Sequence, residues 1–178
     1  MRVMRSVTLM LLVCLCSINL LAESAAGVRW TAPMGWKIAP AQAMRAATYT
    51  IAATTGDKAG GECGVYFFGA GQGGSVDANI ERWKGQFQGP DGKPAAAKIT
   101  KRPASHGLAI TTIDTSGSYS GLSGPLANGQ PAPGYRLLGA IVEAPGGNIF
   151  VKFAGPAKTV AANQAKFEQL LTSFQPGN

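Results

Sequence analysis

Cysteine and histidine are scarce in this 178-residue chain, which contains three cysteines and a single histidine. Two of the cysteines, Cys14 and Cys16, lie in an apolar segment near the start, so only Cys63 belongs to the remainder. One cysteine cannot form an intramolecular disulfide, and together with one histidine it cannot complete a closed zinc site. A calcium loop rich in Asp and Asn is also absent. The sequence therefore predicts no metal site and no cofactor.

Acidic residues are also few, with nine Asp and Glu against 16 Lys and Arg, for a formal charge of +7. The acidic residues are scattered, which argues against a pair of catalytic carboxylates. The basic residues are spread as well, apart from Lys98, Lys101 and Arg102, whereas nucleic-acid binders concentrate theirs in a stripe. We therefore expect a solvated cationic surface and no nucleic-acid partner.

The most informative feature that is present is an apolar run over residues 7–22. Two arginines precede it, and small residues follow it as far as Ala26. Basic, apolar and small regions in this order are typical of a secretory signal peptide, and the run is shorter than the roughly 20 residues of a permanent span. We expect a leader over residues 1–26 that is cleaved between about Ala22 and Ala26. A single periplasmic or secreted domain over residues 27–178, with no permanent membrane span, would remain.

Short segments with alternating or β-branched residues predict strands. These segments are residues 47–54, 62–69, 98–102, 108–114, 117–122, 135–143 and 148–154. Pro145, Gly146 and Gly147 separate the last two and predict a hairpin turn. Because tight turns connect consecutive strands, we expect antiparallel pairing.

Two segments have the spacing of amphipathic helices. The first covers about residues 75–88, with Ser75 as its N-cap and an apolar stripe at Val76, Ile80, Trp83 and Phe87. The second covers about residues 157–173. The sequence therefore predicts an α+β domain, in which an antiparallel sheet is flanked by these two main helices.

This order of elements resembles the PsbP-like fold, which includes a thylakoid oxygen-evolving accessory protein and many small exported bacterial proteins. The similar features are the opening Pro33-Met34-Gly35-Trp36, an early helix after paired strands, and a terminal helix that closes on Ser173-Phe174. Residues 71–83 are also similar to a segment of exported bacterial proteins of unknown function. The resemblance implies a PsbP-like sandwich and a non-catalytic accessory or binding domain. None of the group's metal- or partner-contacting residues matches a position here.

A glycine-rich segment over residues 69–74 satisfies the G-x-G-x-x-G pattern between a predicted strand and a predicted helix. In dinucleotide-binding folds these glycines let the backbone approach a pyrophosphate. Here Asp91, about 20 residues on, falls in a turn and not at the end of a second parallel strand. We interpret the segment as a flexible turn before a capped helix. The alternative is an anion held by the free amides at Gly73, Gly74 and Ser75.

Cys63 is the candidate for a reactive thiol, with His106 as its base and Asp114 as the group that orients the base. However, Cys63 shares a strand face with Val65 and Phe67, where a buried and inert cysteine is expected. An intermolecular disulfide through Cys63 is a further alternative.

A long loop over residues 123–134 precedes Tyr135 and Arg136, and we expect this region to form the contact surface. The sequence thus predicts a non-catalytic exported binding or accessory domain. Its partner would be an envelope protein, a polysaccharide or a small ligand. The alternative function is a thiol-dependent enzyme or redox protein centred on Cys63.

Overall fold

The computed structural model describes residues 22–121 and 130–177. Residues 1–21 of the expected leader over residues 1–26, and residues 123–129 of the loop over residues 123–134, lie outside the described residues. The described strands are β1 (Ala22–Ala25), β2 (Val28–Thr31), β3 (Lys37–Ile38), β4 (Arg45–Ile51), β5 (Gly61–Tyr66), β6 (Phe87–Gln88), β7 (Ala97–Ser105), β8 (Leu108–Tyr119), β9 (Ala132–Ala144), β10 (Gly147–Pro156) and β11 (Gln175–Pro176). The described helices are α1 (Val76–Lys84), α2 (Ala157–Ala162) and α3 (Gln164–Thr172).

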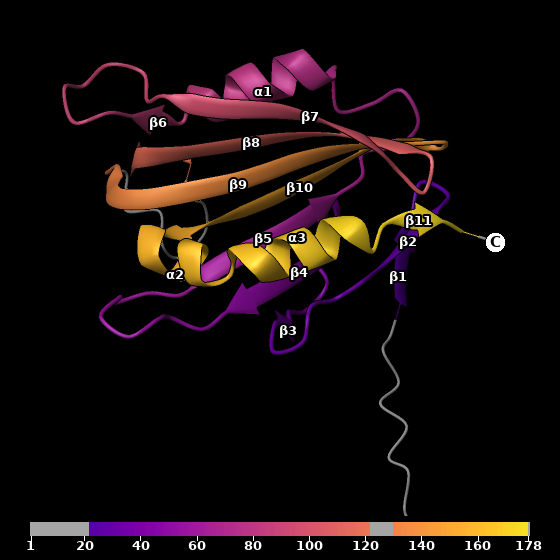
Figure 1. Cartoon of the computed structure of the whole chain (residues 1–178), viewed down its shortest axis with the longest axis horizontal. Helices are drawn as coiled ribbons and strands as arrows, with labels where there is room; N and C mark the ends of the chain where they lie inside the picture. Colours follow the sequence, from indigo (N-terminus) through magenta and orange to yellow (C-terminus); the bar gives the residue numbers. More distant parts are fainter. Residues whose placement is uncertain (1–21, 122–129, 178) are drawn as a thin grey trace, which may run out of the picture.

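The strands form two sheets (Figure 1). The larger sheet has the order β3-β4-β5-β10-β9-β8-β6, with β7 also paired to β8. The smaller sheet has the order β1-β2-β11 and brings the two ends of the described fold together. Every pairing between the described strands is antiparallel, as predicted. The predicted hairpin is confirmed, because Gly147 pairs with Ala144 across the turn between β9 and β10.

The prediction of an α+β sheet flanked by two main helices is wrong. The fold is 48% strand and 17% helix, so it is mostly β, and its helices are short. The first helix ends at Lys84 instead of continuing to residue 88. Phe87 leaves the predicted helical stripe and pairs with Tyr119 as part of β6, which buries its ring against the sheet.

The second predicted helix is divided into α2 and α3 at Asn163, whose φ of −109° and ψ of 8° leave the helical region. Its side chain explains the break, because it bonds in two directions. The Asn163 amide donates to the Thr159 carbonyl at 2.9 Å, and its oxygen accepts from Trp36 Nε1 at 3.1 Å. Asparagine side chains that satisfy nearby backbone groups compete with helical hydrogen bonding.

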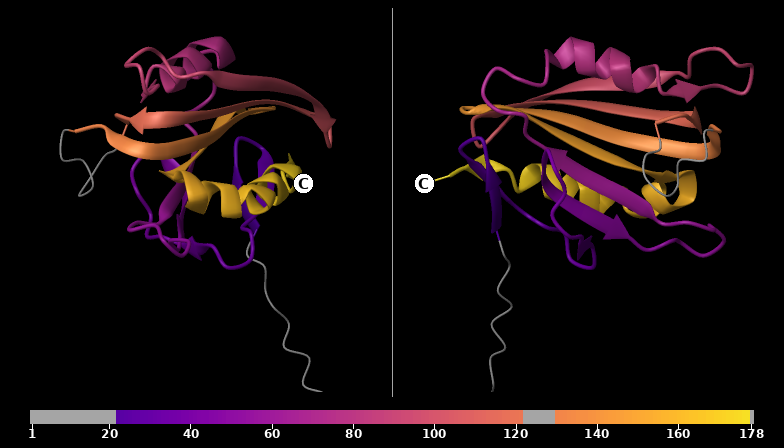
Figure 2. Two further views of the ribbon diagram at one scale, coloured as in Figure 1. Left: turned by 60° about the vertical axis from the view of Figure 1, so that its left-hand side comes forward. Right: turned by 180° about the vertical axis from the view of Figure 1, so that it is seen from behind.

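Hydrophobic clusters cover both faces of the large sheet. Helices α2 and α3 and the small sheet pack on one face, and α1 packs on the other (Figure 2). Alternation along each strand determines which side chains enter which cluster. Along β10, for example, Val151 and Phe153 enter the first cluster, whereas Phe150 enters the second.

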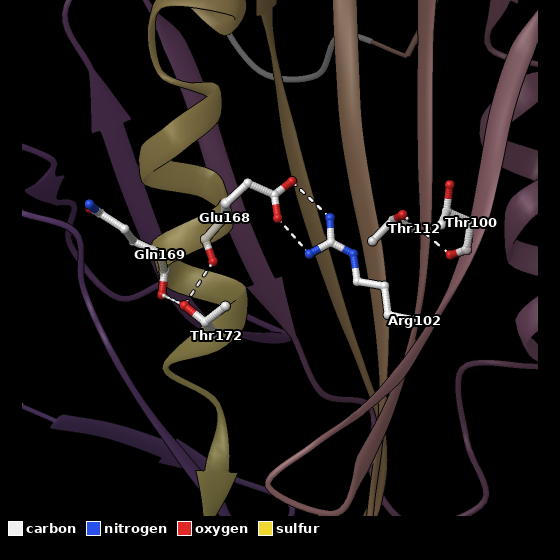
Figure 3. Close-up of polar contacts among 6 residues, drawn as sticks. All are labelled: Thr100, Arg102, Thr112, Glu168, Gln169 and Thr172. Carbon is white, nitrogen blue, oxygen red and sulfur yellow. Dashed lines mark hydrogen bonds and ion pairs between the residues drawn. The ribbon is translucent and has the colours of Figure 1, made fainter.

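A charged contact attaches α3 to the edge of the large sheet (Figure 3). Arg102 on β7 donates two hydrogen bonds to the carboxylate of Glu168 on α3, and the Nη2–Oε1 distance is 2.8 Å. This bidentate geometry fixes the helix orientation across strands β8 and β9. A larger pocket opens on the opposite face of the sheet, which carries α1.

Candidate ligand pocket on the α1 face of the large sheet

A pocket of about 500 Å³ lies on the face of the large sheet that carries α1. Strands β4, β5 and β10 supply most of its lining, and the end of β8 and the start of β9 complete it. We call it the tyrosine–lysine pocket after its large side chains, which are Arg45, Glu62, Tyr66, Tyr119, Tyr135 and Lys152. Its size falls in the range of pockets that hold small molecules.

The position of Lys152 follows from strand alternation and from its neighbours. It faces away from Val151 and Phe153, on the side of the sheet that carries α1. Its partners on the adjacent strands are two glycines, Gly64 on β5 and Gly139 on β9. Neither of these neighbours has a side chain, so space is left on both sides of the lysine.

Aromatic rings occupy the space above both glycines. A Cβ atom at Gly64 would lie 2.7 Å from the Tyr66 ring, and a Cβ atom at Gly139 would lie 2.7 Å from the Trp83 ring. A Cβ atom essentially never lies this close to another non-bonded heavy atom, so both rings pack directly on the glycine backbone. The two glycines therefore allow two rings to flank Lys152.

The Lys152 ammonium has a polar partner but no carboxylate partner. Its Nζ donates to Gln86 Oε1 at 2.7 Å and lies 5.2 Å from the centre of the Tyr119 ring. Among the described residues it makes no ion pair. The pKa of Lys152 is lowered to about 8, mainly by burial and then by the nearby positive charges of Arg82 and Arg45, against an opposing effect of Glu62. The pocket therefore holds a positive charge that the surrounding residues do not neutralise.

The other cation of the pocket, Arg45, is neutralised. Its Nη1 lies 2.7 Å from Glu62 Oε1, and its guanidinium lies 5.1 Å from the centre of the Tyr66 ring. Burial raises the pKa of Tyr66, so its hydroxyl stays uncharged at neutral pH. Lys152 therefore supplies the net charge of the pocket.

Two rings of the pocket lining, Tyr119 and Tyr135, belong to a stack of three that continues to the buried Phe87. The ring centres of Phe87 and Tyr119 are 4.7 Å apart, and those of Tyr119 and Tyr135 are 5.9 Å apart, with interplanar angles of 22° and 20°. The Tyr119 hydroxyl donates to the Gly121 carbonyl at 2.9 Å, which fixes the central ring. A cation without a carboxylate partner can attract the acid group of a ligand, and the uncharged rings beside it can cover the ligand's apolar part.

Of the two residues expected on the contact surface, Tyr135 lines this pocket and Arg136 does not. The two are neighbours on β9 and face opposite sides of the sheet. Arg136 donates to both carboxylate oxygens of Asp114, at 2.8 and 2.7 Å, and also to Gln164 at 3.0 Å. Its guanidinium is therefore already satisfied within the protein.

The glycine-rich turn lies in a different place. Gly73 and Gly74 line an open hollow together with Gln72 and Arg82. Ser75 is the N-cap of α1, because its hydroxyl accepts from the Ala78 amide at 3.2 Å. The Gly73 carbonyl accepts from the Asn79 side chain at 2.8 Å. These polar groups thus stabilise the start of the helix.

The structure does not bring together the three side chains that were candidates for thiol chemistry. Cys63 is fully buried on the face opposite the pocket, and burial raises its pKa well above the usual range, which disfavours the reactive thiolate. His106 Nδ1 lies 3.1 Å from the Phe174 carbonyl oxygen, and Asp114 is paired with Arg136. Each of the three side chains therefore has surroundings other than those that thiol catalysis requires.

Sequence reasoning missed Lys152, Arg45, Glu62 and Tyr66 as pocket residues. A signal for Lys152 was present, because it is a charged residue in a predicted strand and shares a face with Phe150 and Ala154. A lysine among apolar residues on a strand face is rarely buried unless it has a partner. The other three depend on strand pairing, which the sequence does not reveal.

No protein-family model matches the chain, and no curated protein matches it. Among solved structures, it is similar to the crystal structure of a protein of unknown function from Pseudomonas aeruginosa, whose description suggests a regulator. The TM-score is 0.49 at 12% identity, with 89% of this chain and 97% of that chain covered. We draw no conclusion about this chain from a likeness at this level, and the resemblance to the PsbP-like group stays a prediction. Within residues 22–121 and 130–177, no helix is long and apolar enough to cross a membrane.

Proposed function

We propose that this chain is an exported, non-catalytic binding domain that takes a small anionic ligand into the tyrosine–lysine pocket. The observation that carries the proposal is the Lys152 ammonium, which lies in a pocket of about 500 Å³ and has no carboxylate partner among the described residues. A buried charge is costly unless it is paired. An anionic ligand would supply the missing partner.

The residues of the pocket support binding more strongly than they support a chemical reaction. The tyrosine hydroxyls are neutral, because burial raises the pKa of Tyr66 and of Tyr119. Glu62 is held by Arg45. The thiol-dependent enzyme or redox protein is not carried forward, because no observation at Cys63 favours it.

The leader pattern is the support for export, and β1 bears on where the leader is cleaved. Cleavage after Ala22 would keep residues 23–25 of β1, and the Glu23 carboxylate accepts from Trp30 Nε1 at 3.0 Å and also from the Tyr49 hydroxyl. Cleavage after Ala26 would remove this strand and that carboxylate. We therefore expect the exported protein to begin at Glu23. The intact mass of the exported protein would show this, and a mass that corresponds to a chain beginning at Gly27 would contradict it.

Binding of simple anions tests the function itself. Acetate and inorganic phosphate are titrated into the protein while backbone amide chemical shifts are followed by NMR. We expect saturable shifts at residues 61–66 and 150–154 in the native protein, because these residues surround Lys152. The variant Lys152→Met should lose these shifts, whereas the exposed control Lys101→Met should keep them. Shifts that are absent from the native protein, or that persist in Lys152→Met, would overturn the proposal.

A further inference from the structure

We infer that the ligand of the tyrosine–lysine pocket is a flat aromatic acid with a single negative charge, held with its carboxylate at Lys152 and its rings against the tyrosines. This inference rests on the proposed function and specifies its ligand class. Three features of the pocket carry it, which are its charge, its aromatic side and the small residues of its lining.

The charge favours a monoanion. Lys152 is one unneutralised cation in the lining, since Arg45 is paired with Glu62 at 2.7 Å. The Lys152 ammonium donates to Gln86 and keeps further donors for an incoming oxygen. One carboxylate would neutralise this charge without leaving an excess negative charge in a partly desolvated site.

The aromatic side favours a ring. Tyr135 lines the pocket and is partly exposed, and it stacks on Tyr119, a buried ring that also stacks on Phe87. Tyr66 is a third tyrosine in the lining and has the Arg45 guanidinium near its ring. Rings of a ligand gain from offset stacking or edge contacts with such groups beyond the area that they bury.

The rest of the lining is small, which leaves room for a flat molecule. Alanines and glycines of β5, β10 and the turn between β4 and β5 make up much of it, at Ala52, Ala53, Ala59, Gly60, Gly61 and Ala154. At Gly60 a side chain is sterically excluded, because a Cβ atom there would lie 2.1 Å from the Ile51 carbonyl oxygen.

The test compares 2-naphthoate with its fully saturated analogue, decahydro-2-naphthoate, by isothermal titration calorimetry. The two acids carry the same charge on the same two-ring skeleton, and differ in flatness and aromaticity. We expect 2-naphthoate to bind about 2- to 12-fold more tightly for each ring contact that it makes. The preference should disappear in Tyr135→Leu and remain in the matched control Tyr135→Phe, which keeps the ring. If Tyr135→Leu does not fold, Tyr66→Leu with Tyr66→Phe makes the same comparison.

The outcomes separate this inference from the proposed function. If both acids bind equally and binding depends on Lys152, the inference is overturned and the anion-binding function stands. If the preference is present but survives in Tyr135→Leu, or in Tyr66→Leu where that variant replaces it, the inference is also overturned. If neither acid binds, and acetate and phosphate do not bind either, both proposals fail.

Discussion

Replacing Lys152 by methionine is expected to make the protein more stable while it removes affinity for small anions. Methionine keeps the length and apolar stem of the lysine but removes the charge. The ammonium of Lys152 is partly desolvated, lies near Arg82 and Arg45, and has no carboxylate partner among the described residues. Removing such a charge relieves a desolvation cost. A residue that costs stability in the free protein and is retained for binding is typical of a functional site.

The expected gain in the free energy of unfolding is about 1–2 kcal/mol at pH 7, since Lys152 is not fully buried and solvent screens part of the effect. The size of this gain changes with pH in a defined way. The folded pKa is about 8, below the value of about 10.4 in an unfolded chain. Between these values the unfolded chain binds more protons, so native stability rises with pH across this window. The advantage of Lys152→Met should therefore be largest below pH 8 and shrink toward pH 10.4.

Urea denaturation of the native protein, Lys152→Met and Lys101→Met at several pH values measures this effect. Lys101 is exposed on β7, so its replacement should change stability by less than about 0.5 kcal/mol. If Lys152→Met is less stable than the native protein at pH 7, the lysine stabilises the fold and its charge is not held for a ligand.

Replacing Gly139 by alanine is expected to lower the free energy of unfolding by about 1–3 kcal/mol, as overpacking does in a close-packed core. The added Cβ atom would lie 2.7 Å from the Trp83 ring and 2.8 Å from Ile113 Cγ2. Both of these side chains are buried in the cluster under α1, so neither can move away freely. The substitution would also shift the Trp83 ring, which changes the environment of Lys152.

Gly85→Ala is the matched control for this substitution. Gly85 has a φ of −61°, and its nearest neighbours are 3.5 and 3.6 Å from the added Cβ atom, which are ordinary contacts. Alanine there should leave stability unchanged or raise it by up to about 1 kcal/mol, because it restricts the unfolded chain. Thermal and urea unfolding of both variants measure the difference. Equal stabilities would contradict the packing of Trp83 on the glycine backbone.

Local patterns in the sequence predicted part of this fold well. Strand segments, their antiparallel pairing and the turn after Ala144 could be predicted, because alternation and Pro-Gly pairs act over a few residues. Residues 108–114 and 117–122 were expected as two strands, yet they form the single strand β8 with an irregularity near Gly117. The two helices were predicted too long, since tertiary contacts of Phe87 and Asn163 outweigh helical periodicity.

The candidate site was harder to predict from the sequence. Tyr135 was singled out and does line the pocket, but Arg136 faces the other side of the sheet. Arg45 and Glu62 come from the consecutive strands β4 and β5, whereas Lys152 comes from β10, and their proximity depends on the order β4-β5-β10. Because β10 reaches β5 only after a long excursion of the chain, no local signal places these residues together.

The pKa of Lys152 itself, followed by NMR at its side-chain Cε and Hε atoms, tests the binding site most directly. In the free protein this lysine should titrate near pH 8, well below the value of about 10.4 in an unfolded chain. Saturation with 2-naphthoate should raise its pKa, because an anion stabilises the protonated amine. A Lys152 that titrates with the ordinary lysines, and does so equally with and without the acid, would contradict a buried cation kept for an anionic ligand.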